Sequence, residues 1–114
     1  VHVQKERAFT QKIIKIIESN LANPDLDIAF LCKETGMSRT KLYQELKSIH
    51  SQSAGDFIRT LRMRRAAHLM TYENLSIGEI MFQVGIQTQS YFTKAFKKEF
   101  GKTPKQFISD LKVR

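Results

Sequence analysis

The chain has 114 residues, enough for one compact unit or two very small ones but too few for a large enzyme with an accessory domain. Hydrophobic residues make up 41% of it, and only five glycines and two prolines are present, which favours a folded helical chain over a turn-rich β fold. The formal net charge of +8 indicates an anionic partner, and the single cysteine excludes an internal disulfide framework. Because the sequence begins with Val1 rather than methionine, we expect it to be part of a longer chain.

Apolar periodicity and helix start signals predict an all-α chain of seven helices. Two capping boxes stand out, Ser76 with Glu79 and Thr103 with Gln106, in which each side chain satisfies a free backbone N–H group of the other residue. The other predicted N-caps are Asp27, Ser38, Ser53 and Thr88. The helices are expected at residues 5–21, 28–34, 39–49, 54–70, 77–83, 89–99 and 104–112.

The chain repeats itself at an offset of 50 residues. The segment LKSIHSQSAGDFIRTLR (46–62) aligns with FKKEFGKTPKQFISDLK (96–112), which places Phe57 on Phe107. Each half is predicted to contain a short helix, a glycine turn, a second helix and a capped third helix. Two copies are too few for a solenoid, so the pattern indicates a duplicated unit.

The two glycine turns share one layout, in LCKETGMS (31–38) and in IMFQVGIQT (80–88). Apolar residues end a short helix, Gly36 or Gly85 supplies a left-handed turn, an apolar residue plugs the turn, and a hydroxyl residue caps the next helix. This layout is typical of a helix-turn-helix, whose second helix is presented to the major groove of DNA.

Both second helices are predicted to have an apolar inner face and a polar outer face, because each residue turns about 100° around the helix axis. Leu42, Leu46 and Ile49 share the inner face of the first, and Phe92 and Phe96 that of the second. The outer faces carry amides, hydroxyls and cations, which can hydrogen-bond base edges and phosphates. One lysine-rich face alone usually indicates only a solvated helix. Two such faces, each after a glycine turn at matched spacing, favour DNA recognition.

Positive charge gathers on the second helices and the segments that follow them. Residues 38–65 hold seven basic and two acidic residues, and residues 89–114 hold the same numbers, whereas the remainder of the chain is net negative. Contact with phosphates requires such a distribution. By contrast, His2, His50 and His68 show no metal-ligand spacing, and no phosphate loop or nucleophile elbow appears. We therefore expect no enzyme, metal site or cofactor.

The segment IGEIMFQVGIQTQSYFTKAFKKEFGKTPKQF (77–107) resembles the signature of the AraC/XylS transcriptional regulators, I-A-x-x-V-G-F followed by S-Y-F-x-R-x-F-K-x-x-x-G-x-T-P. The matching residues are Ile80, Val84, Gly85, Tyr91, Phe92, Phe96, Lys97, Gly101, Thr103 and Pro104. The segment FIRTLRMRRAAHLM (57–70) resembles the linker helix of this family. Within the family, the opening of the chain looks most like the C-terminal output domain of hybrid two-component regulators.

The resemblance implies two helix-turn-helix lobes at 1–53 and 71–114, joined by a linker helix at 54–70 that sets their spacing. Their recognition helices would enter successive major grooves about 34 Å apart. By position in the family, base contacts are expected from Thr40, Tyr43, Gln44, Gln89, Ser90 and Lys94. Phosphate contacts are expected from Arg39, Lys41, Lys47, Lys97 and, at the N-terminus of the last helix, Thr103. The sequence departs from the family at Ser51, where glycine is common, so a left-handed helix end is less expected there.

The leading hypothesis is therefore a sequence-specific DNA-binding domain of a bacterial transcription regulator, acting in the cytoplasm. Its expected partners are double-stranded DNA, RNA polymerase and an upstream sensor, receiver or dimerisation domain of the full-length protein. No small-molecule ligand is expected in this fragment. The alternative is a basic helical module that binds an acidic protein or an anionic membrane, which explains the charge but not the duplicated turns.

Overall fold

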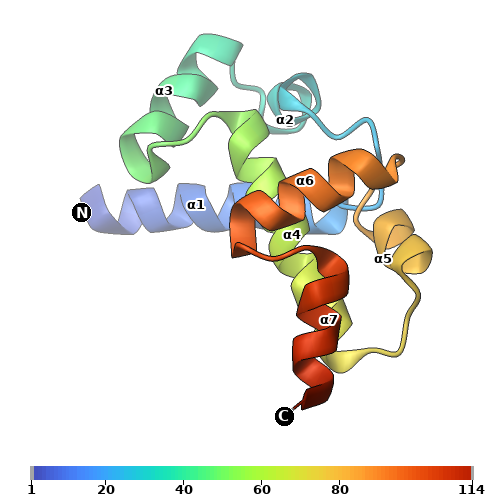
Figure 1. Cartoon of the computed structure of the whole chain (residues 1–114). Coiled ribbons are helices and arrows are strands. Elements are labelled where there is room, and N and C mark those ends of the chain that lie inside the picture. Colours follow the sequence, from blue (N-terminus) through green and yellow to red (C-terminus); the bar gives the residue numbers. More distant parts are fainter. Residues whose placement is uncertain (1, 114) are drawn as a thin grey trace. The chain divides into compact units, whose positions relative to one another are not determined.

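The computed structural model describes residues 2–113, without the side chains of residues 2–7, 49, 50 and 113. Over this range the chain forms seven α-helices and no strand (Figure 1), as predicted, with ends that differ from the expected ones by a few residues. The helices are α1 (His2–Ser19), α2 (Ile28–Thr35), α3 (Arg39–His50), α4 (Ala54–Tyr72), α5 (Ile77–Gln83), α6 (Gln89–Phe100) and α7 (Pro104–Val113).

Helix α1 ends two residues before the predicted boundary because the side chain of Asn20 closes it. The Asn20 amide Nδ2 donates to the carbonyl of Ile16 over 2.7 Å, and the Asn20 N–H donates to the carbonyl of Ile17 over 3.0 Å. These bonds satisfy carbonyl groups that would otherwise lack a partner at the helix end.

The chain divides into two compact units. The first comprises residues up to 21 together with 25–58, and the second comprises residues 22–24 together with the chain from 59 onward. The division falls within α4, so this one helix begins in the first unit and continues into the second.

The core of the first unit forms where α2 packs against both α1 and α3. Helix α1 carries apolar residues at helical spacing, and its Ile13 and Ile17 are fully buried. The other buried apolar side chains of this unit are Leu21, Leu26, Leu31, Leu42, Leu46, Ala54, Phe57 and Ile58. Leu42 and Leu46 therefore lie inward as predicted, while the predicted inner-face residue Ile49 falls outside the described side chains.

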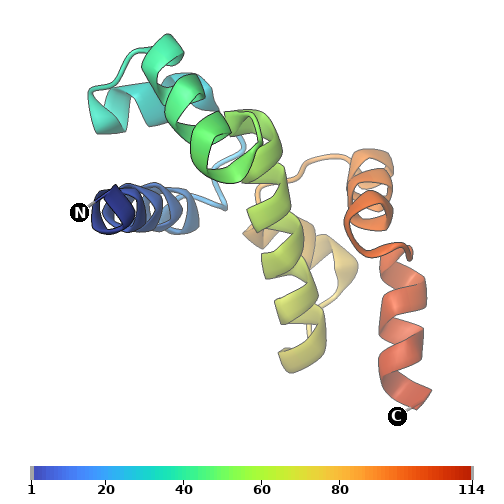
Figure 2. The ribbon, with the colours of Figure 1, turned by 90° about the vertical axis from the view of Figure 1, so that its left-hand side faces the viewer.

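The core of the second unit is built from α4, α5 and α6. Its buried residues are Met63, Ala66, Leu69, Met70, Ile80, Val84, Ile86, Phe92, Ala95 and Phe96. Phe96 is the centre of an aromatic cluster, with its ring centroid 4.8 Å from that of Phe100 and 5.4 Å from that of Phe107. Because Phe107 lies on α7, these contacts hold α7 against α6, and Figure 2 shows the tight turn that joins them, orange to red.

Both predicted capping boxes are present. The N–H of Glu79 donates to Ser76 Oγ over 3.1 Å, and the N–H of Ser76 donates to Glu79 Oε1 over 2.9 Å. In the second box the N–H of Gln106 donates to Thr103 Oγ1 over 3.2 Å, and the N–H of Thr103 donates to Gln106 Oε1 over 2.9 Å. The hydrogen bonds with Ser76 hold the pKa of Glu79 below its ordinary value of 4.5. The carboxylate is thus stabilised in its charged form, as expected in the first turn of a helix.

The predicted side-chain cap at Thr88 is wrong, and the end of α3 at Ser51 differs from the expected conformation. Thr88 lies at the N-cap of α6 in extended backbone, but its side chain forms no cap hydrogen bond. Thr88 is exposed, and helix α6 begins instead with the Phe92 N–H donating to the Thr88 carbonyl over 3.1 Å. Ser51 does adopt the left-handed conformation, at φ 56°, and within residues 2–113 no other residue except glycine has a positive φ.

Candidate nucleic-acid interface

In the first unit, the turn between α2 and α3 forms from local signals alone. The N–H of Phe30 donates to Asp27 Oδ1 over 2.9 Å and starts α2. Gly36, at φ 72°, ends that helix with its N–H donating to the carbonyl of Cys32 over 2.9 Å. Ser38 then caps α3 by accepting from the N–H of Lys41 over 3.2 Å. These bonds fix where α3 begins and therefore which of its residues face outward.

Helix α3 presents a polar face to solvent. Its inward residues Leu42 and Leu46 have no exposed surface, and the intervening positions project away from them. All six predicted contact residues of this unit are exposed: Arg39, Thr40, Lys41, Tyr43, Gln44 and Lys47. Tyr43 keeps 47% of its surface exposed, a high value for a large aromatic side chain, so its ring and hydroxyl are accessible to a partner.

The turn between α5 and α6 repeats this arrangement in the second unit. Val84 and Ile86 are buried on either side of Gly85, which has φ 72°. The N–H of Ile86 donates to the carbonyl of Met81 over 2.9 Å, which closes the turn. A residue with a side chain at position 85 would be strained, because this region of backbone space favours glycine.

Helix α6 is amphipathic in the predicted sense. Phe92, Ala95 and Phe96 are buried, and the remaining face carries the amide, hydroxyl and ammonium groups. The predicted contact residues Gln89, Ser90, Lys94 and Lys97 are all exposed, as is Lys98. The phenylalanines therefore fix the helix on its own unit, while the cations and polar groups remain available for a ligand.

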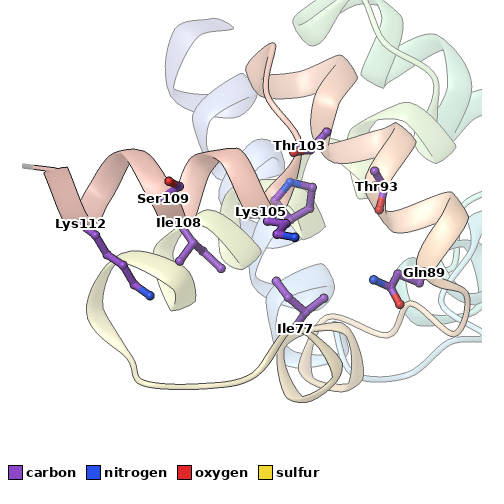
Figure 3. A pocket seen from close by; sticks show the side chains of 9 residues that line it. Ile77, Gln89, Thr93, Thr103, Lys105, Ile108, Ser109 and Lys112 are labelled. Atoms are coloured by element: carbon purple, nitrogen blue, oxygen red, sulfur yellow. The ribbon is translucent and has the colours of Figure 1, made fainter.

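A hollow of about 660 Å³ lies between α6 and α7 in the second unit (Figure 3). Gln89 and Thr93 line it from α6, and Thr103, Lys105, Ser109 and Lys112 line it from the α7 side. Thr103 is half-buried because its hydroxyl accepts the capping bond from Gln106. Two predicted contact residues, Gln89 and Thr103, thus share one depression with Lys105, a cation that is not among the predicted contacts.

Not every basic residue of the cationic segments is available to a partner. Arg62, counted in the sequence among the available cations, is only 8% exposed, and burial lowers the pKa of its guanidinium, an effect that nearby Tyr91 partly opposes. Arg64 Nε lies 3.7 Å from Glu99 Oε1, and Lys102 pairs with Asp110. Spacing could have identified Arg62, because it stands four residues after Ile58 and four before Ala66, both of which are buried.

The described part of the chain holds no group of three or more His, Cys, Asp or Glu residues placed to bind a metal ion. His68, named above among the scattered histidines, lies exposed with its ring 4.9 Å from that of Tyr72. Between residues 2 and 113, no helix is long and apolar enough to cross a membrane.

Comparison with known proteins identifies close relatives of this arrangement. A family described as "Helix-turn-helix domain" matches residues 31–110. The probable transcription factor PqrA of Proteus vulgaris is 30% identical over 96 residues, covering 83% of this chain and 79% of that protein. Histidine kinase P4 of Formosa agariphila is 37% identical over 102 residues, covering 90% of this chain but 7% of the kinase. The C-terminal domain of AraT, a response regulator from Geobacillus stearothermophilus, has 29% identity and a TM-score of 0.81, covering 88% of this chain and 83% of that one.

Two helix-turn-helix units in one chain, each with an exposed polar and cationic second helix, define the DNA-binding domain of a transcription regulator. The chain belongs to the AraC-type helix-turn-helix family, a family of DNA-binding regulators rather than of enzymes. It spans a small part of the first relatives it matches, 7% of the histidine kinase and 37% and 32% of the next two regulators.

Proposed function

We propose that this domain binds a bacterial promoter by inserting α3 and α6 into successive major grooves of the duplex. The observation that carries the proposal is the matched exposure of both second helices, each placed by a left-handed glycine turn and each anchored by fully buried residues on its inner face. A helix held in this way can enter the major groove without losing contact with its own unit.

Base readout is assigned to the polar residues at the start and middle of each helix. In α3 these are Thr40, Tyr43 and Gln44, and in α6 they are Gln89, Ser90 and Lys94. Glutamine can pair bidentately with adenine, whereas lysine donates to guanine or to phosphate as a single charge. Exposure of all six side chains supports this assignment.

Phosphate contacts are assigned to Arg39, Lys41, Lys47, Lys97 and Thr103. Lys47 and Lys97 stand at corresponding positions, each three residues after a predicted base-reading residue, Gln44 or Lys94, and both lysines are exposed. The hollow between α6 and α7 supports a further contact, because Lys105 and Thr103 border it next to Gln89. A sugar-phosphate strand lying there would meet hydroxyl, amide and ammonium groups, beside the apolar side chains of Ile77 and Ile108.

The names and lengths of the relatives support a regulatory setting for this domain. The histidine kinase is much longer than this chain, and AraT is a response regulator by name, which supports an upstream sensor or receiver domain in the full-length protein. We place the domain in the cytoplasm, where promoter DNA and RNA polymerase are found, and assign it the role of bringing the polymerase to the promoter. The isolated domain is expected to bind weakly, because dimerisation would come from outside it.

A titration of the chain against duplex DNA tests the proposal. Duplexes are first selected from a random pool by binding to the chain, and affinities for the selected and a scrambled duplex are then measured by fluorescence anisotropy over a salt series. We expect tighter binding to the selected duplex and a loss of affinity with salt that reflects several phosphate contacts. Equal affinity for both duplexes, or preferential binding to anionic vesicles or an acidic protein, would instead support the basic interaction module.

A further inference from the structure

Arg62 is a buried cation without a carboxylate partner in the described chain. Its Nη2 donates to the main-chain carbonyl of Asn23 over 2.8 Å, and its Nε, also buried, has no hydrogen-bond partner. An unpaired charge in a core is unfavourable, and an apolar side chain of similar size there is often at least as stabilising. The hydrogen bond from Arg62 to the Asn23 carbonyl therefore explains the presence of a buried arginine better than a contribution to core stability does.

The group that Arg62 holds belongs to the connection between α1 and α2. Residues 22–24 are part of the second unit, although the chain immediately before and after them is part of the first. Leu21 and Leu26 belong to the first unit and are both buried, at 6% and 4% exposure. An extended chain spans at most about 3.6 Å per residue, so Asn23 can lie no more than roughly 7 Å from Leu21 and roughly 11 Å from Leu26. While Arg62 holds Asn23, the short segments on either side of Asn23 can therefore change their length very little.

We propose that Arg62 is a positioning residue for two-site DNA binding, because it turns the α1–α2 connection into a second tether between the two units. The first tether is α4, because the boundary between the two units falls between residues 58 and 59 of this helix. A single helical link leaves bending and twisting free, whereas two links far apart in sequence restrict both. Restricting the free domain lowers the entropy lost when both recognition helices bind at once. This consequence for DNA rests on the proposed function, but the tether itself does not.

Pulsed electron spin resonance measures the tether without DNA. In a Cys32→Ser background, spin labels are attached through Ser48→Cys on α3 and Lys98→Cys on α6, both exposed positions. Arg62→Met keeps the length of the side chain but removes the donors, and we expect a clearly broader distance distribution. Arg62→Lys, which keeps a donor, is expected to restore much of the narrow distribution. The matched control is Arg64→Met, which removes an exposed charge from the same helix and is expected to change nothing.

A second variant covers the case in which Arg62→Met does not fold, as judged by circular dichroism. A Gly-Ser-Gly-Ser insertion between Asp25 and Leu26 leaves the bond from Arg62 to Asn23 in place but slackens the connection to the first unit. We expect this insertion to broaden the distribution as Arg62→Met does. Unchanged distributions in the folded variants would overturn the tether.

Binding to selected duplexes whose two half-sites are moved apart by inserted base pairs measures the functional consequence. We expect the wild type to prefer one spacing by about tenfold or more, and Arg62→Met to bind all spacings within about threefold while keeping its affinity for a single half-site. Retained spacing preference in Arg62→Met would refute the positioning role. If the wild type binds no duplex specifically while its distance distribution responds to Arg62→Met, the proposed function fails and the tether stands.

Discussion

Ser51 and Gly101 end the two recognition helices with the same backbone geometry. Ser51 has φ 56° and its N–H donates to the carbonyl of Lys47 over 3.1 Å, while Gly101 has φ 74° and its N–H donates to the carbonyl of Lys97 over 2.7 Å. The left-handed conformation costs roughly 1–2 kcal/mol for a residue with a Cβ atom. The first unit therefore carries strain at a position where the second carries none.

Ser51→Gly is expected to stabilise the domain. Relief of the strain outweighs the larger conformational entropy that glycine loses on folding, leaving a gain of roughly 0.5–1 kcal/mol. Urea unfolding followed by circular dichroism measures it. The matched reverse change, Gly101→Ala, should lose about 1 kcal/mol through the backbone alone, since a Cβ there meets no atom within 4 Å. A lower urea midpoint for Ser51→Gly would contradict the strain argument.

The stability contributed by Glu79 is expected to depend on pH. Because the folded pKa of this carboxyl lies below its ordinary value of 4.5, its contribution is present above that value and is lost as the pH falls through the folded pKa. Glu79→Gln should keep the capping box, as Gln106 does in the same role at 2.9 Å, but remove this part of the acid dependence. Urea midpoints of both proteins on either side of pH 4.5 measure the difference.

Ser76→Ala distinguishes the stability that comes from the Ser76 hydroxyl cap from the stability that comes from the charge of Glu79. It removes the hydroxyl that caps α5 and should lose about 1 kcal/mol even at neutral pH. An acid dependence in Glu79→Gln equal to that of the wild type would show that other carboxyl groups account for it.

The glutamines of the recognition helices are expected to set base preference. Gln44→Ala or Gln89→Ala should lose about 1–3 kcal/mol of binding on the selected duplex and much less on a scrambled one. Anisotropy titrations with both duplexes at one salt concentration measure this. Gln11→Ala, at an exposed position on α1, is the control and should bind like the wild type. Equal losses on both duplexes would argue against base readout.

The lysines are expected to act on all sequences alike. Lys47→Ala or Lys97→Ala should weaken binding to selected and scrambled duplexes by the same factor and reduce the salt slope by about 1, because one phosphate contact is lost. Lys15→Ala, an exposed lysine of α1, removes the same charge elsewhere and should leave the slope nearly unchanged. A loss confined to the selected duplex would assign Lys47 or Lys97 to base contact instead.

Local signals predicted most of the fold, because helix ends depend on a few neighbouring residues. The capping boxes at Ser76 and Thr103 and the turns at Gly36 and Gly85 were read from residue types at fixed spacing. The left-handed end at Ser51 was less expected, because a serine carries a Cβ atom that disfavours this conformation.

The sequence predicted which side chains of the candidate site point outward, but not the individual contacts that they make. Helical spacing shows which side chains of α3 and α6 point outward, since Leu42 and Phe96 must point inward. It also places Arg62 on the buried side of α4, but it does not identify the partner of the guanidinium, the Asn23 carbonyl 39 residues away along the chain. Which outward side chain meets which base depends on the shape and sequence of the duplex, and no pattern within the chain fixes that.

The inner faces of the two recognition helices are filled by side chains of different size, leucines in α3 and phenylalanines in α6. Transplanting one whole helix onto the other unit would leave voids in one place and overcrowd the other. The two units therefore have similar architecture, but their recognition helices cannot be exchanged whole. A new operator specificity is better engineered by exchanging only the solvent-facing residues and keeping the buried residues of each helix.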